Sequence, residues 1–257
     1  MGTTSDYTMK KTLLELTQDI LNDLDGDEVN SINDTVEATQ VANIVRSSYE
    51  GMINKRNWPH LKTVSQLSGV GDTTSPTKMQ LPDGCKELVS IYYNKRKTGD
   101  TRDKYSEVVY MAPDEFLIEL NGRDSSATTV MTVVDYGATK LFIRNNKAPA
   151  YWTSFDDDFI IMDSYDTDVD TTLQQSKTQA VMYKDPSFTF EDTFVPDLPS
   201  EAFTNLLEEA KSTASLVLRQ MPDEKAEQKA RRQSAWLSRK AWKATGGIQY
   251  PNFGRRR

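Results

Sequence analysis

Apolar residues recur at helical spacing near both ends of the chain. The spacing predicts amphipathic helices over about residues 9–24 and about residues 34–55. The first ends at Asp25-Gly26, and the second stops before Trp58-Pro59 because a residue that precedes proline is biased out of the helical region. Two further helices follow Pro199 and Pro222, and the last ends at Gly246-Gly247. The apolar faces of the first three are formed by Leu13, Leu14, Ile20, Leu21 and Leu24, by Val41, Val45, Tyr49 and Met52, and by Phe203, Leu207, Ala210, Ala214 and Val217.

The middle of the chain has the pattern of β-structure. From Leu61 to Phe194, short runs rich in Val, Ile, Thr, Tyr and Phe are separated by Gly, Pro, Asn and Asp, which predicts a mostly antiparallel β region. One short helix, Pro113–Leu120, interrupts it. The expected strands are Thr63–Leu67, Lys78–Leu81, Glu87–Asn94, Val130–Tyr136, Lys140–Arg144, Phe159–Met162 and Thr178–Tyr183.

The order of elements predicts an α+β fold. We expect a helical bundle formed by both chain ends, an inserted, mostly antiparallel β domain, and an extended C-terminal arm. The expected boundaries are 1–60 for the N-terminal helices, 61–197 for the β domain, 198–246 for the C-terminal helices and 247–257 for the basic arm.

The composition excludes several classes of site. The 257 residues include a single cysteine, Cys85, and a single histidine, His60. An internal disulfide framework, a cysteine-rich zinc site and a multi-histidine metal site are therefore ruled out. No apolar run approaches the ~18 residues of a membrane span, and the polar first residues lack the apolar core of a secretion signal. We expect no metal, no cofactor and no membrane contact.

Catalytic motifs are equally scarce. The alternating acids Asp23, Asp25 and Asp27 lack the glycine that an EF-hand needs, no phosphate-binding loop occurs, and no local signature supports a Cys85–His60 pair. The acids of Asp156-Asp157-Asp158 lie between aromatic residues, as glycosidase carboxylates often do, although adjacent acids at a hairpin tip usually form a solvated turn. We therefore predict a protein that is not an enzyme, and keep a carbohydrate-active β domain as the weakest hypothesis.

Charge is distributed unevenly along the chain. The formal net charge is −7, yet residues 219–257 carry eleven basic residues against three acidic ones. Residues 151–198 carry eleven acidic residues against two basic ones. A basic end on an acidic body favours contact between that end and an acidic surface, either nucleic acid or another protein.

The basic helix supports an alternative function. Arg231, Arg232 and Arg239 alternate with Trp236 and Trp242, and basic residues with aromatics can bind nucleic acid through phosphate contacts and stacking. A nucleic-acid-binding module that uses this helix and the arm is the second hypothesis. The acidic isoelectric point, about 4.9, argues against it.

The whole pattern resembles a known family. A leucine-rich first helix, an acidic linker around Asp25–Asp34, and a long helix that ends at Arg56-Asn57-Trp58 open the chain, and a helix over Glu201–Leu218, a basic helix and an arm rich in Gly, Tyr, Pro and Arg close it. This arrangement resembles the head-to-tail adaptor proteins of short-tailed bacteriophages, also called tail tubular protein A. The resemblance covers the whole chain, although the β insertion is larger than in the smallest members.

The resemblance implies a structural protein of the virion, assembled in the host cytoplasm. It implies a ring, typically of about twelve copies, that joins the portal protein to the tail nozzle protein and lines the channel through which double-stranded DNA leaves. An acidic wall would repel phosphate, and Asp156, Asp157 and Asp158 are the candidate channel residues. The candidate portal or subunit contacts lie in the basic helix and the arm: Arg239, Trp242, Lys243, Tyr250, Phe253, Arg255, Arg256 and Arg257.

Overall fold

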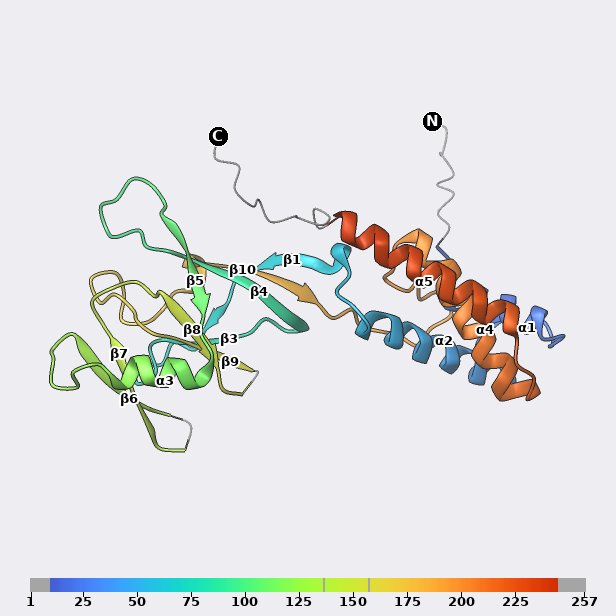
Figure 1. Cartoon of the computed structure of the whole chain (residues 1–257), viewed down its shortest axis with the longest axis horizontal. Coiled ribbons are helices and arrows are strands. Elements are labelled where there is room, and N and C mark those ends of the chain that lie inside the picture. The colour runs from blue at the N-terminus through green and yellow to red at the C-terminus, as the bar shows by residue number, and fades with distance from the viewer. Residues whose placement is uncertain (1–9, 136, 157, 245–257) are drawn as a thin grey trace, which may run out of the picture. The chain divides into compact units, whose positions relative to one another are not determined.

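The protein has an α+β fold, as the sequence predicts. The computed structural model describes residues 10–135, 137–156 and 158–244, and only the backbone of residues 240–244. The described part contains five α-helices and a mostly antiparallel sheet (Figure 1). The chain divides into two compact units, a helical unit of Met1–Leu61 with Pro186–Arg257 and a β unit of Lys62–Asp185.

The helical unit contains α1 (Leu13–Asp23), α2 (Val36–Asn54), α4 (Phe203–Arg219) and α5 (Glu224–Ala244), with short 3-10 turns η1 (Pro59–Leu61) and η3 (Ser200–Ala202). Local side chains fix the ends of these helices. Thr12 and Glu15 form a capping box at the start of α1, and the Thr35 hydroxyl accepts a hydrogen bond from the Ala38 amide at the start of α2. After α4, Gln220 adopts a left-handed conformation with φ 54° that ends the helix.

One apolar core holds α1, α2 and α4 together. Leu13, Ile20 and Val45 are fully buried in it, as are Leu206 and Ala210 of α4. The predicted apolar faces of α1 and α2 thus meet α4. The prediction for α4 is wrong at Val217, which is 59% exposed, because the buried face of this helix includes Leu206 and turns away from Val217.

The segment that leads into α4 also packs on this core. Tyr49 of α2 contacts the rings of Phe188 and Phe194 at centroid distances of 6.0 and 6.4 Å. The Leu13 amide donates to the Phe194 carbonyl at 2.7 Å. Residues 186–197, which the sequence analysis assigned to the β domain, therefore pack with the helices, because their aromatic side chains fill the helical core.

The β unit is built on an eight-stranded sheet with the order β1-β10-β4-β5-β8-β9-β3-β2. All of its pairings are antiparallel except β5 with β8. A separate hairpin pairs β6 with β7, and α3 (Pro113–Asn121) follows β5. The strands are β1 (Lys62–Ser65), β2 (Ser68–Gly69), β3 (Lys78–Gln80), β4 (Cys85–Asn94), β5 (Tyr105–Tyr110), β6 (Val130–Asp135), β7 (Thr139–Arg144), β8 (Tyr151–Ser154), β9 (Phe159–Met162) and β10 (Thr178–Lys184).

The core of the β unit lies under α3. Phe116 and Leu120 of α3 are fully buried, together with Ile91 of β4, Leu141 of β7 and Ile160 of β9. Each expected strand is present within two residues of its expected ends, while β2, β5 and β8 were not expected. Although four of the six β5 residues are Tyr or Val, only Val108 is buried, so the strand lacks the alternation of apolar and polar positions that marks a half-buried strand.

Candidate interaction surfaces

Helix α5 is held to α4 by a narrow apolar stripe. The buried side chains of its described part are Ala226, Ala230 and Leu237, and two of these are alanines. Asp223 caps the helix, since its carboxylate accepts hydrogen bonds from the amides of Lys225 and Ala226 at 3.1 and 3.0 Å. A helix that buries so little apolar surface leaves most of its circumference to solvent or to a partner.

Polar contacts complete the attachment of α5. Lys229 Nζ lies 3.0 Å from Glu208 Oε1, and this hydrogen bond raises the pKa of Lys229. Gln233 Nε2 donates to the Glu201 carbonyl at 3.1 Å. These contacts use the side of α5 that faces α4 and η3, so they fix which face of the helix points outward.

The outward face carries an aromatic residue between two arginines. Arg232, Trp236 and Arg239 follow one another at i, i+4 and i+7, so they share one side of the helix. All three are exposed, and Trp236 retains 46% of its accessible surface. Neither arginine forms an ion pair with a described carboxylate. We call these three residues the α5 stripe.

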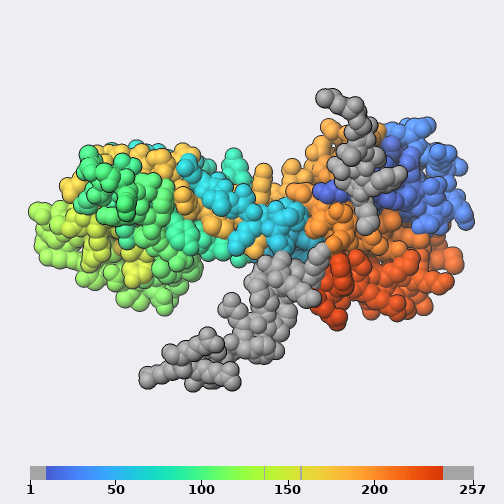
Figure 2. Space-filling view, turned by 90° about the horizontal axis from the view of Figure 1, so that it is seen from above, coloured from blue at the N-terminus to red at the C-terminus, as the bar shows by residue number. Residues whose placement is uncertain are grey.

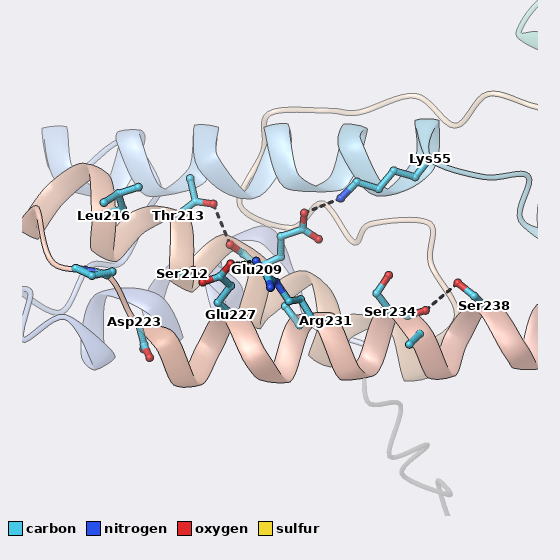
Figure 3. Close-up of a pocket in the computed structure, with 13 residues that line it drawn as sticks. Lys55, Glu209, Ser212, Thr213, Leu216, Asp223, Glu227, Arg231, Ser234 and Ser238 are labelled. Atoms are coloured by element: carbon cyan, nitrogen blue, oxygen red, sulfur yellow. Dashed lines mark hydrogen bonds and ion pairs between the residues drawn. The ribbon is translucent and has the colours of Figure 1, made fainter.

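A shallow groove runs beside the α5 stripe within the helical unit (Figure 3). It has a volume of about 720 Å³ and is lined by α4, α5 and Lys55 at the end of α2. Four of its charged groups form two ion pairs: Lys55 Nζ lies 2.9 Å from Glu209 Oε1, and Arg231 pairs with Glu227. The remaining charged group, Asp223, caps α5. Its lining residues include no histidine or cysteine, and the hydroxyls of Thr213 and Ser238 donate to the helix carbonyls of Glu209 and Ser234 at 3.0 and 2.9 Å.

An acidic loop joins α1 to α2 in the same unit. Asp25, Asp27 and Glu28 are exposed and form no ion pair with other described residues. Two hydrogen bonds hold the loop in a defined conformation. Asp34 Oδ2 accepts one from the Ser31 amide and Asp192 Oδ1 accepts one from the Ile32 amide, each at 2.8 Å. We call residues 24–34 the acidic loop.

The expected contact residues are placed only in part. Arg239 is exposed on α5. Trp242 and Lys243 belong to α5, but their side chains lie outside the described residues, as do Tyr250, Phe253 and Arg255, Arg256 and Arg257 in the expected arm. Their role stays a prediction.

The expected channel residues lie at the turn between β8 and β9. Asp156 and Asp158 are exposed, and Asp157 lies outside the described residues. Asp156 Oδ1 accepts a hydrogen bond from the Phe159 amide at 2.9 Å, so this carboxylate stabilises the turn. Two other acids of the 151–198 stretch, Asp163 and Asp166, are buried and paired with Arg123 and Lys97 at 2.9 Å each, so they add nothing to an exposed acidic surface.

Sequence reasoning missed a second basic surface. The loop between β4 and β5 carries five basic side chains, all exposed. Lys97 pairs with Asp166 and Asp168, and Arg96 lies 3.4 Å from Asp103, so the loop has a defined conformation. The signal was visible as a run of basic residues around Gly99, namely Lys95, Arg96, Lys97, Arg102 and Lys104.

His60 and Cys85, the two residues considered as a catalytic pair, each have defined contacts or burial in the structure. His60 Nε2 lies 3.0 Å from the Asp197 carbonyl, and its ring packs edge-on against Trp58. Burial raises the pKa of the Cys85 thiol, which disfavours the reactive thiolate. Over the described ranges, no three His, Cys, Asp or Glu side chains gather as metal ligands would.

No helix of the described part is both long and apolar enough to cross a membrane. Protein-family models and curated protein sequences were both compared with the chain, and none matches it.

Proposed function

We propose that this chain is a structural head-to-tail adaptor of a short-tailed phage virion. About twelve copies would form a ring that docks on the portal protein, carries the tail nozzle protein and lets double-stranded DNA pass through its channel. No enzymatic step and no cofactor belongs to this function. The protein would assemble in the host cytoplasm and remain at the head–tail interface of the virion.

The observation that best supports this proposal is the division of the chain into a helical unit and a β unit. The helical unit takes its residues from both chain ends, with the β unit between them in sequence. The resemblance implies the same order, with helices first, a β insertion, and helices again. The proposal includes the finer fold: a bundle of α1, α2, α4 and α5, followed by a basic extended arm at 247–257.

The surfaces of the helical unit support a role in assembly. Helix α5 attaches through few apolar side chains and presents arginines and a tryptophan outward. Arginine and tryptophan are enriched at the energetic centres of protein interfaces. A ring needs two different surfaces on each subunit, one for each neighbour, and this unit has a basic surface and an acidic one.

Stoichiometry with the portal tests the proposal. We expect native mass spectrometry and negative-stain imaging of the full chain mixed with its candidate portal to show a ring of about twelve copies. A chain that leaves the portal uncapped at high concentration would contradict it. The portal alone and the chain alone serve as controls, because each must be seen separately before capping can be recognised.

A second candidate function is nucleic-acid binding, favoured by the α5 stripe. Arginines beside an exposed tryptophan can contact phosphates and stack on bases. This function predicts duplex affinity that falls steeply with salt and is lost when Arg231, Arg232 and Arg239 become alanine. The net charge of −7 opposes it, because the chain as a whole repels a polyanion.

A further inference from the structure

We propose that the α5 stripe of one subunit docks on the acidic loop of a second copy of this chain. The inference deepens the proposed ring and rests on it for the number of copies. It names which two surfaces meet between neighbours, namely Arg232, Trp236 and Arg239 on one side and Asp27 and Glu28 on the other.

Both surfaces have charges without partners of their own. In the described part of the chain, Arg232 and Arg239 pair with no carboxylate, and Asp27 and Glu28 pair with no basic group. Most other charged residues of the helical unit are paired within it, for example Lys211 with Asp23 at 2.5 Å and Arg219 with Glu37 at 3.4 Å. Complementary charges left open on one chain are available to a second copy.

The two surfaces do not meet within one chain. Figure 2 shows the N-terminal helices (blue) and α5 (red) on different sides of the helical unit. The start of α5 does approach the acidic loop, since Asp25 and Lys225 line one hollow. The α5 stripe begins seven residues beyond Lys225, which places it about 10 Å further along the helix, away from that hollow.

The charges also select the geometry of the contact. If two copies met through the same surface, the arginines of one α5 stripe would face the arginines of the other, which is unfavourable. A head-to-tail contact instead places arginine opposite carboxylate. Such a contact repeats from subunit to subunit and closes into a ring when the rotation allows it.

Trp236 adds an apolar side chain at the centre of the proposed contact, which is otherwise formed by charged residues. It lies between the two arginines along the helix and keeps nearly half of its surface exposed. A tryptophan surrounded by charged residues is the usual arrangement of an interface centre with a polar rim. Val36, the first residue of α2 and close in sequence to the acidic loop, is 76% exposed and offers an apolar surface to such a side chain.

Charge reversal tests the contact. The full chain is compared by sedimentation velocity, in low and high salt, with two variants: R232E/R239E and D27K/E28K. We expect the wild type to associate with an affinity that falls with salt, and each variant alone to associate at least about tenfold more weakly, because like charges then face each other. An equimolar mixture of the two variants should regain association, since every interface between unlike copies again joins opposite charges.

The matched control is K95E/R102E in the loop between β4 and β5. It changes the net charge by the same amount at two exposed basic residues that form no ion pair with described residues. We expect it to associate like the wild type. The inference is overturned if R232E/R239E associates normally, if the mixture fails to recover, or if the wild type stays monomeric up to its solubility limit.

Failure of this inference is distinguishable from failure of the adaptor function. Each variant is also imaged with the portal. Rings on the portal that form equally well with R232E/R239E would overturn the inference and leave the adaptor function standing. Recovery by the mixture without any capping of the portal would leave the inference standing and overturn the adaptor function.

Discussion

Arg123 and Asp163 form an ion pair that is almost completely buried in the β unit. Arg123 Nη2 lies 2.9 Å from Asp163 Oδ2, and the two side chains are 3% and 1% exposed. Arg123 Nη1 also donates to the carbonyls of Asp163 and Phe142 at 2.6 and 3.1 Å. Asp163 Oδ1 accepts from the amides of Ala150 and Tyr151 at 2.8 and 3.0 Å. The pair therefore joins the end of α3 to β7, β8 and β9.

Asp163→Ala should destabilise the β unit strongly. The substitution leaves the Arg123 charge and two amides buried without their acceptor, and breaking such a pair costs about 3–5 kcal/mol. Urea unfolding, combined with hydrogen exchange of amides in β8 and β9, measures the loss. Asp168→Ala is the matched control, because its carboxylate is 78% exposed and solvent screens its pair with Lys97, so the free energy of unfolding should stay close to the wild-type value. Equal effects of the two substitutions would contradict the prediction.

A second prediction concerns Asp192, which holds the acidic loop. Its Oδ1 accepts from the Ile32 amide at 2.8 Å and from the Ser31 hydroxyl at 3.2 Å. Ile32 is fully buried, so Asp192→Ala leaves a buried donor unsatisfied, at a cost of about 1–3 kcal/mol. Thermal unfolding of the full chain should show the loss, together with faster hydrogen exchange in residues 29–34. Glu191→Ala, a change at the exposed neighbouring carboxylate, should leave both measurements at wild-type values.

Alkaline pH should weaken the β unit through Tyr93. Burial raises the pKa of Tyr93 to about 12, and the nearby carboxylates of Asp170 and Asp166 add to the effect. The folded pKa lies above the ordinary value of 10, so the stabilisation is fully present below pH 10 and is lost as pH rises towards 12.

Tyr93→Phe separates this contribution from general alkaline unfolding. Tyrosinate absorbance of the wild type should show one late-titrating group that the variant lacks, and the stability of the variant should fall less between pH 10 and 12. The exposed Tyr105 serves as the control, because Tyr105→Phe should leave the late step in place. A late step that survives Tyr93→Phe would assign it to another tyrosine.

The regular part of the fold was predictable because local signals agreed with burial. Phe159–Met162 was expected with its exact ends, since an apolar run between polar turns has one consistent interpretation. By contrast, β5 is a mostly exposed strand. It pairs with the preceding strand β4 on one side and, in parallel, with β8, a strand much further along the chain, on the other. Such pairings leave little periodic trace in a single sequence.

For the candidate surfaces, the sequence predicted which segments are basic or acidic, but not which of their side chains are exposed. The basic character of the last helix was evident, but its outward face depends on Ala226, Ala230 and Leu237 packing towards α4, which fixes the rotation of the helix. The acidic stretch 151–198 is less of an exposed acidic surface than its composition predicts, because some of its carboxylates are buried. Counting charges along the chain cannot distinguish Asp163, which is buried against Arg123, from Asp158, which is exposed.

The last prediction concerns the expected arm. Deletion of residues 248–257 removes Arg255, Arg256 and Arg257 together with Tyr250 and Phe253, and should abolish docking of the chain on the portal. The fold should be retained, because among the described side chains the buried core residues of both units lie between residues 13 and 237. Co-sedimentation with the portal measures docking, and circular dichroism measures the fold.

The arm and the α5 stripe make separable contributions under this prediction. The proposed contact between copies uses Arg232, Trp236 and Arg239, which the deletion leaves in place. A truncated chain should therefore associate with itself as the wild type does while it ignores the portal. A second variant, R255A/R256A/R257A in the full-length chain, removes the charges of the arm and keeps its length. If the arm docks through its arginines, both this variant and the deletion fail to dock. If it docks through Tyr250 and Phe253, only the deletion fails. Docking that persists after the deletion would remove the arm from the portal interface and leave the exposed basic surfaces of the described chain to account for it.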